Sequence, residues 1–115
     1  MIIKICGLTN IDDVLSAINF GADWLGFIFA ESPRKIDINR CKQISDYLKT
    51  KAFTSSTDNY YSNSNFNKKI YKVGVFMNQS IEEILEITNF CDLDIIQLHG
   101  NENVFNVKQR TSKLI

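Results

Sequence analysis

Residues 71–98 read YKVGVFMNQSIEEILEITNFCDLDIIQL, and this stretch decides the fold class. It begins with one short apolar run, 71–77, and ends with another, 94–98, and both are typical of buried strands. Between them, apolar side chains recur at helical spacing behind a capping box formed by Ser80 and Glu83. A strand, a helix and a second strand in this order predict a βαβ unit with two parallel strands.

The same alternation extends along the rest of the chain. We predict further strands at residues 2–6 and 24–29, and helices at 10–20, 37–48, 80–90 and, more weakly, 102–110. Residues 113–115 look like the opening of a fifth strand. The strand candidates are almost continuously apolar, which favours a parallel α/β sheet covered by helices. Periodicity alone leaves two architectures open, a doubly wound open sheet and part of a closed barrel.

Residues 50–69 break this pattern. The segment is rich in Ser, Asn and Thr and is far longer than the roughly 2 to 6 residues that usually join a helix to a strand. Its composition predicts a flexible surface insertion. An active-site lid is the alternative, but a helix-to-strand connection lies away from the strand C-termini where barrel enzymes place their chemistry.

Composition excludes several function classes. The 115 residues suffice for one domain, and 13 basic residues balance 13 acidic ones. We therefore expect neither nucleic acid nor a membrane surface as a partner. The sequence shows neither a signal peptide nor a membrane-spanning run of about 18 apolar residues. Three widely spaced cysteines do not form a metal-binding or C-x-x-C pattern, so we expect no metal site, reduced thiols and a cytoplasmic location.

Reactive or polar residues follow the ends of the apolar runs, and four of them are candidate site residues: Cys6, Arg34, Gln97 and His99. In a parallel sheet these strand ends lie at one edge, where ligands bind. Cys6 could act as a general base or nucleophile. Arg34 carries a planar fork suited to a carboxylate. His99 could donate to a ligand, and Gln97 lies on its side of the strand.

Each candidate also has a purely structural interpretation. Cys6 could pack as a small apolar residue, and Arg34 could be an ordinary exposed loop residue. His99 could hydrogen bond to backbone, and Gln97 could fill a barrel interior. We expect the other two cysteines, Cys41 and Cys91, to be fillers on helix faces.

Several motifs resemble those of the phosphoribosylanthranilate isomerase family, in the same order along the chain. They are KICGLT at 4–9, FGADWLGFIF at 20–29, SPR at 32–34, VGVFMN at 73–78 and DIIQLHG at 94–100. The resemblance spans residues 1–115 apart from the Ser/Asn-rich insertion. It implies the N-terminal half of a TIM (β/α)8 barrel, with about four βα units and truncation near the start of strand 5.

The resemblance also implies a reaction. The family performs an Amadori rearrangement of N-(5-phospho-β-D-ribosyl)anthranilate to 1-(2-carboxyphenylamino)-1-deoxyribulose 5-phosphate, a step of tryptophan biosynthesis that needs no cofactor. By this resemblance Cys6 is the general base, Arg34 meets the anthranilate part, and Gln97 and His99 line the pocket. The phosphorylated substrate is then a small-molecule partner.

The family's general acid and phosphate-binding loops belong to the second half of the barrel. We therefore expect the chain to be inactive alone, and to form either a homodimer or an association with a C-terminal half. Three alternatives stay open: a non-catalytic half-barrel that self-associates, a different cysteine-dependent α/β enzyme on an open sheet, and a gene product without a role.

Overall fold

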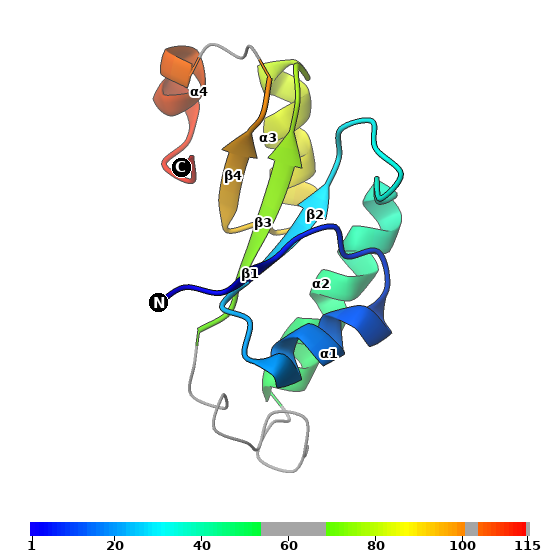
Figure 1. Ribbon diagram of the computed structural model, residues 1–115. Coiled ribbons are helices and arrows are strands. Elements are labelled where there is room, and N and C mark those ends of the chain that lie inside the picture. Colours follow the sequence, from blue (N-terminus) through cyan, green and yellow to red (C-terminus); the bar gives the residue numbers. More distant parts are fainter. Residues whose placement is uncertain (54–68, 101–103, 115) are drawn as a thin grey trace.

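The computed structural model describes residues 1–53, 69–100 and 104–114. Its elements alternate along the chain (Figure 1): β1 Lys4–Ile5, α1 Ile11–Phe20, β2 Trp24–Ile28, α2 Ile38–Phe53, β3 Tyr71–Phe76, α3 Ile81–Phe90, β4 Ile95–Leu98 and α4 Val104–Arg110. The strands form one sheet in the order β1-β2-β3-β4, and every neighbouring pair is parallel. The predicted parallel α/β class is confirmed.

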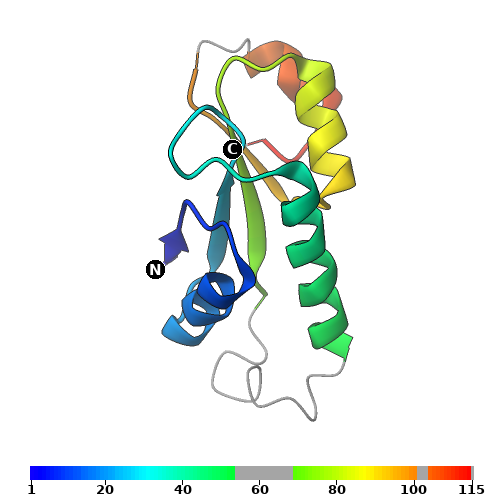
Figure 2. The same ribbon diagram turned by 90° about the vertical axis from the view of Figure 1, so that its right-hand side faces the viewer.

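A single apolar cluster joins the helices to the sheet. It includes Leu25 and Phe27 of β2, together with inward-facing residues of α1, α2 and α3. Figure 2 shows α2 and α3 along the same side of the sheet. Along each strand, alternate side chains enter this cluster, and the others face the opposite side. The sheet therefore has a helix-covered face and an inner face.

Local capping residues mark the ends of two helices, and the capping box predicted at Ser80 is among them. The Asn10 side chain accepts a hydrogen bond from the Asp13 backbone N–H at 2.8 Å, which caps α1. Gly21 closes the same helix with φ 107°, a left-handed conformation that favours glycine. The Ser80 hydroxyl accepts from the Glu83 N–H at 3.1 Å at the start of α3.

Some predicted boundaries are wrong. The strand predicted at residues 2–6 shortens to Lys4–Ile5, although the Ile3 carbonyl still accepts from the Trp24 N–H and the Gly7 N–H still donates to the Gly26 carbonyl of β2. The helix predicted to end at residue 48 continues to Phe53, because neither glycine nor proline interrupts it. Most of the predicted insertion, residues 54–68, lies outside the described part of the chain, as do 101–103 of the last predicted helix.

The suggested fifth strand leaves a trace beside β4. Leu114 forms an isolated parallel bridge with Ile96, and the Ile96 N–H donates to the Lys113 carbonyl at 2.9 Å. The sheet thus continues past β4 in the parallel sense.

Asp92 connects the turn after α3 to the lysines around it. Its carboxylate lies 2.8 Å from the Lys49 Nζ and 3.7 Å from the Lys72 Nζ. The hydrogen bond from Lys49 holds the pKa of the Asp92 carboxyl below its ordinary value. Asp92 also has φ 54°, a conformation that Asn tolerates as well as Asp does.

We predict that Asp92→Asn lowers the free energy of unfolding by about 0.5–1 kcal/mol at neutral pH, because the pair is half exposed. A carboxyl group whose pKa is lower in the folded state stabilises that state at pH values above its ordinary pKa. This contribution is lost as the pH falls below about 4. The difference between the variant and the parent should therefore close in that range, as measured by urea unfolding. Glu31→Gln, which removes an exposed pair with Lys35, is the control and should leave stability unchanged. A gap that persists at low pH would contradict the assignment.

Candidate active site

Parallel pairing brings the ends of the four strands to one edge of the sheet. The chain leaves β1 at Cys6, β2 at Phe29, β3 at Met77 and β4 at His99, and the arrowheads of β2, β3 and β4 in Figure 1 point the same way. The His99 N–H donates to the Phe76 carbonyl at 2.8 Å, so this residue still belongs to the edge of the sheet. Three of the four predicted site residues, Cys6, Gln97 and His99, are thus at or beside this edge.

Cys6 lies against β2 on the inner face of the sheet. The Gly26 backbone is so close that a Cβ added there would lie 2.9 Å from the Cys6 Sγ. Gly26 therefore leaves the space that the thiol occupies, and any larger residue would displace it. Cys6 is partly exposed and free, so a solute at the edge can reach it.

Arg34 comes from the loop between β2 and α2 and reaches back to the end of β1. Its Nη1 donates to the Cys6 carbonyl at 3.3 Å. Its guanidinium lies over Gly7, where an added Cβ would be 2.5 Å from Nη1 and 2.8 Å from Nε. Gly7 has φ 85°, so both its conformation and its missing side chain permit this contact. The structure brings Arg34 and Cys6 together.

Gln97 and His99 form a second group that extends across the inner face. The Lys4 Nζ donates to the Gln97 Oε1, and the Gln97 Nε2 is 2.9 Å from the His99 Nε2. A lysine can only donate, so the amide oxygen must face Lys4 and the amide nitrogen must face His99. The His99 Nε2 is then the acceptor, which favours the tautomer with its proton on Nδ1.

The sequence analysis missed the contact between Lys4 and Gln97. That contact joins residues 93 positions apart, so no local pattern could reveal it. Gly7 and Gly26 were visible as glycines, but the neighbours that require them were not. The alternation of side chains along β1 was the available signal, because it puts Lys4 and Cys6 on one face.

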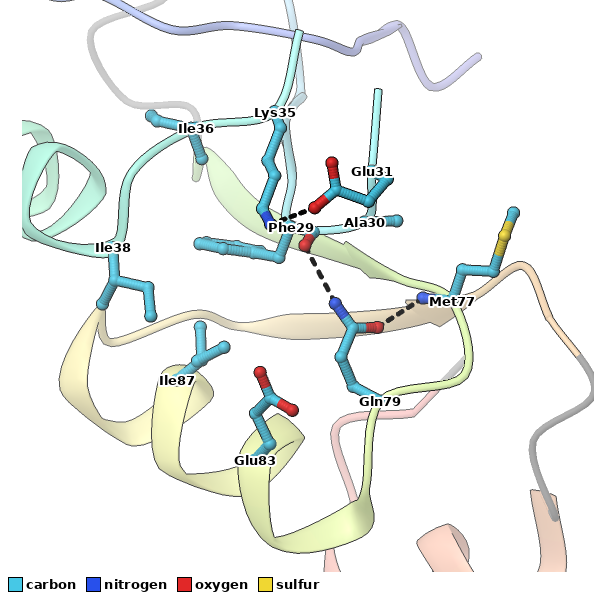
Figure 3. Close-up of a pocket in the computed structure, with 10 residues that line it drawn as sticks. All are labelled: Phe29, Ala30, Glu31, Lys35, Ile36, Ile38, Met77, Gln79, Glu83 and Ile87. Atoms are coloured by element: carbon cyan, nitrogen blue, oxygen red, sulfur yellow. Dashed lines mark hydrogen bonds and ion pairs between the residues drawn. The ribbon is translucent and has the colours of Figure 1, made fainter. Parts of the chain in front are cut away.

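A separate hollow of about 300 Å³ opens on the helix side of the same edge (Figure 3). Phe29, Ile87 and the Glu83 side chain line it. Gln79 crosses it, donating to the Phe29 carbonyl at 2.9 Å and accepting from the Met77 N–H at 2.6 Å. The four predicted site residues do not line this hollow. Its glutamine is occupied in holding the β2 and β3 loops together.

Two classes of site find no support in the described residues. They contain no group of three or more His, Cys, Asp or Glu side chains placed to hold a metal ion. Nor does any helix in ranges 1–53, 69–100 and 104–114 have the length and apolar character needed to cross a bilayer.

Comparison with known proteins gives a consistent result. The sequence model of the N-(5'phosphoribosyl)anthranilate (PRA) isomerase family matches residues 39–114. The N-(5'-phosphoribosyl)anthranilate isomerase of Bacillus cereus (strain B4264) is 38% identical over 109 residues, which is 95% of this chain and 45% of that protein. The chain spans about half the length of the curated relatives it matches.

Solved structures show the same half-length match. Phosphoribosyl anthranilate isomerase from Thermotoga maritima is 30% identical, with a TM-score of 0.71 over 96% of this chain and 47% of that one. A second such structure, with the same identity and TM-score, covers 50% of its chain and was solved with reduced 1-(o-carboxyphenylamino)-1-deoxyribulose 5-phosphate. The predicted partial (β/α)8 barrel of about four βα units is confirmed, and the chain belongs to the phosphoribosylanthranilate isomerase family.

Proposed function

We propose that residues 1–115 form the N-terminal half of an isomerase barrel and supply the general base of its reaction. The reaction is the rearrangement of N-(5-phospho-β-D-ribosyl)anthranilate to 1-(2-carboxyphenylamino)-1-deoxyribulose 5-phosphate. The observation that carries the proposal is the position of the Cys6 thiol. It is partly exposed at the C-terminal end of β1, and the Arg34 guanidinium hydrogen bonds to the backbone carbonyl of the same residue. Family membership makes this reaction class the first to test.

The chemistry needs two proton transfers at different atoms. Protonation of the ribose ring oxygen opens the ring to a Schiff base, and removal of the C2′ proton then gives an enolamine that becomes the ketone. Cys6, as the thiolate, takes the C2′ proton in this scheme. The proposal leaves the first transfer to a group outside these residues.

Arg34 is proposed to hold the anthranilate part of the substrate. Its guanidinium is exposed, and the hydrogen bond to the Cys6 carbonyl uses one of its five N–H donors. A carboxylate that accepts two of the others would be fixed next to Cys6. The substrate would then be oriented by the same side chain that marks the position of the base.

Gln97 and His99 are proposed to form the opposite wall of the pocket. Lys4 and Gln97 fix each other, and the amide of Gln97 orients the imidazole. A wall with fixed donors positions a polar substrate at a smaller entropic cost than mobile side chains would.

The partners of the chain are proposals as well. The substrate would be a phosphorylated small molecule, as the name of the relatives indicates for them. One isomerase from Thermotoga maritima is described as dimeric. For this chain we propose either a homodimer or association with a C-terminal half.

Cys6→Ala tests the proposed base. The protein assayed is a fusion of residues 1–115 to the C-terminal half of the Bacillus cereus relative, with and without the substitution. The unfused chain is assayed in parallel. Loss of a positioned general base should lower kcat by about 10²–10⁴-fold while changing KM little. Turnover is followed by chromatography of substrate and product.

Cys41→Ala is the control, because that thiol is buried in the apolar cluster on the helix side of the sheet. It should keep turnover close to that of the parent. If Cys6→Ala retained the full rate in a fusion that turns over, Cys6 could not be the base.

Gly7→Ala tests the position of Arg34. A methyl group at Gly7 would lie 2.5 Å from the Arg34 Nη1, so the guanidinium must move. We expect the fusion protein to bind reduced 1-(o-carboxyphenylamino)-1-deoxyribulose 5-phosphate about 10–100-fold more weakly, the cost of one or two charge-assisted hydrogen bonds. Isothermal calorimetry measures the affinity.

Gly21→Ala is the matched control. Gly21 also has a positive φ, 107°, but nothing lies within 4 Å of an added Cβ. It should lose about 1–2 kcal/mol of stability through backbone strain and bind the analogue normally. Equal binding by the two variants would show that Arg34 does not contact the ligand from this position.

A further inference from the structure

Two cysteines that are 50 positions apart meet where α3 ends and α2 begins. Cys41 lies in the first turns of α2, Cys91 directly follows α3, and both are 0% exposed. The Cys91 thiol donates to the Ile38 carbonyl at 3.5 Å. A helical carbonyl points along the helix towards the following turn, which here contains Cys41. Figure 2 shows the C-terminal end of α3 next to the N-terminal end of α2.

The two thiols interact directly. A hydrogen bond between them raises the pKa of Cys41, and burial raises it further. The same hydrogen bond lowers the pKa of Cys91, and the nearby Lys42 ammonium lowers it as well. The Lys42 ammonium thus favours the thiolate of Cys91, and the thiolate is the nucleophile in sulfur chemistry.

A hollow of about 360 Å³ opens beside this pair. Ile38, whose carbonyl holds the Cys91 thiol, and Phe90, which precedes Cys91, both line it. Each water molecule in the liquid occupies about 30 Å³, so a solute of similar size fits easily. The hollow thus adjoins the pair through these two neighbours, although neither cysteine lines it.

We propose that Cys41 and Cys91 are a disulfide-forming pair whose oxidant is hydrogen peroxide or a similarly small hydroperoxide. The Cys91 thiolate attacks one peroxide oxygen, the O–O bond breaks, and hydroxide leaves as a sulfenic acid forms on Cys91. The Cys41 thiol then attacks that sulfur, the S–S bond forms, and the sulfenic oxygen leaves as water. Peroxide is reduced by two electrons and the two thiols are oxidised.

The third cysteine is separated from this pair by the sheet. The Cys6 Sγ packs on the inner face against Gly26, whereas Cys41 and Cys91 belong to the apolar cluster on the helix side. Oxidation of the folded chain should therefore give one specific link, and this link does not involve the thiol proposed for catalysis. The inference is independent of the proposed function.

The Cys6→Ser variant, in which Cys41 and Cys91 are the remaining cysteines, gives the sharpest test. Treatment of the folded protein with hydrogen peroxide should reduce its thiol count, measured after unfolding, from two to none. Peptide mapping without reductant should find residues 41 and 91 joined within one chain, and dithiothreitol should restore both thiols. The double variant Cys6→Ser, Cys91→Ser should form no intramolecular link.

The parent chain gives a measurement that requires no substitution. Its three thiols should fall to one, the survivor or its oxidised acid should map to Cys6, and the linked form should unfold at higher urea concentration. Two thiols that persist in folded Cys6→Ser protein would overturn the proposal, as would links between chains only. So would a Cys41–Cys91 link that forms equally fast after unfolding in urea.

Discussion

The candidate site depends on one constraint, which is that the four neighbouring strands β1, β2, β3 and β4 all pair in parallel. A parallel strand can be reached only by a crossover, so each strand must be followed by a helix that returns the chain to the starting edge. The two edges of the sheet then differ. At the starting edge, the carboxylates of Asp23 and Asp94 accept hydrogen bonds from the Ile3 and Lys72 N–H groups, at 2.7 and 2.8 Å. These bonds stabilise the sheet at its starting edge. The loops that carry reactive side chains lie at the other edge.

The contact between Lys4 and Gln97 shows how far the sheet curls. Three strand spacings of about 4.8 Å separate β1 from β4, so the two side chains could not meet on a flat sheet. The register also places them at different levels, since Lys4 pairs with Trp24 whereas Gln97 pairs with Val75, the partner of Ile28. A stagger of about one residue per strand, as in a barrel, compensates for that offset. The curl brings residues of the first and fourth strands to one inner surface.

The sequence could predict what depends on near neighbours. The cap at Ser80 acts within one helical turn, so its role was visible without coordinates, and the caps at Asn10 and Gly21 are equally local. The position of Cys6 at the end of the first strand was predicted in the same way, from the apolar run that precedes it.

Contacts between distant residues could not be predicted in this manner. The space for the Cys6 thiol depends on Gly26, and the position of Arg34 depends on Gly7, because packing of separate elements decides both. The meeting of Cys41 with Cys91 depends in the same way on how α3 packs against α2, and helical spacing says nothing about it.

The loop that carries Arg34 connects the two faces of the sheet. At its far end, the Ile36 N–H donates to the Ile28 carbonyl at 2.9 Å, which returns the chain to β2 before α2 begins. The first turn of α2 then provides the carbonyl that holds the Cys91 thiol. Arg34 is thus held at the end of β1 on the inner face. Ile38, four residues later, contacts Cys91 at the end of α3 on the helix face. One short loop thus joins the contact of Arg34 on the inner face to the contact between the first turn of α2 and the end of α3 on the helix face.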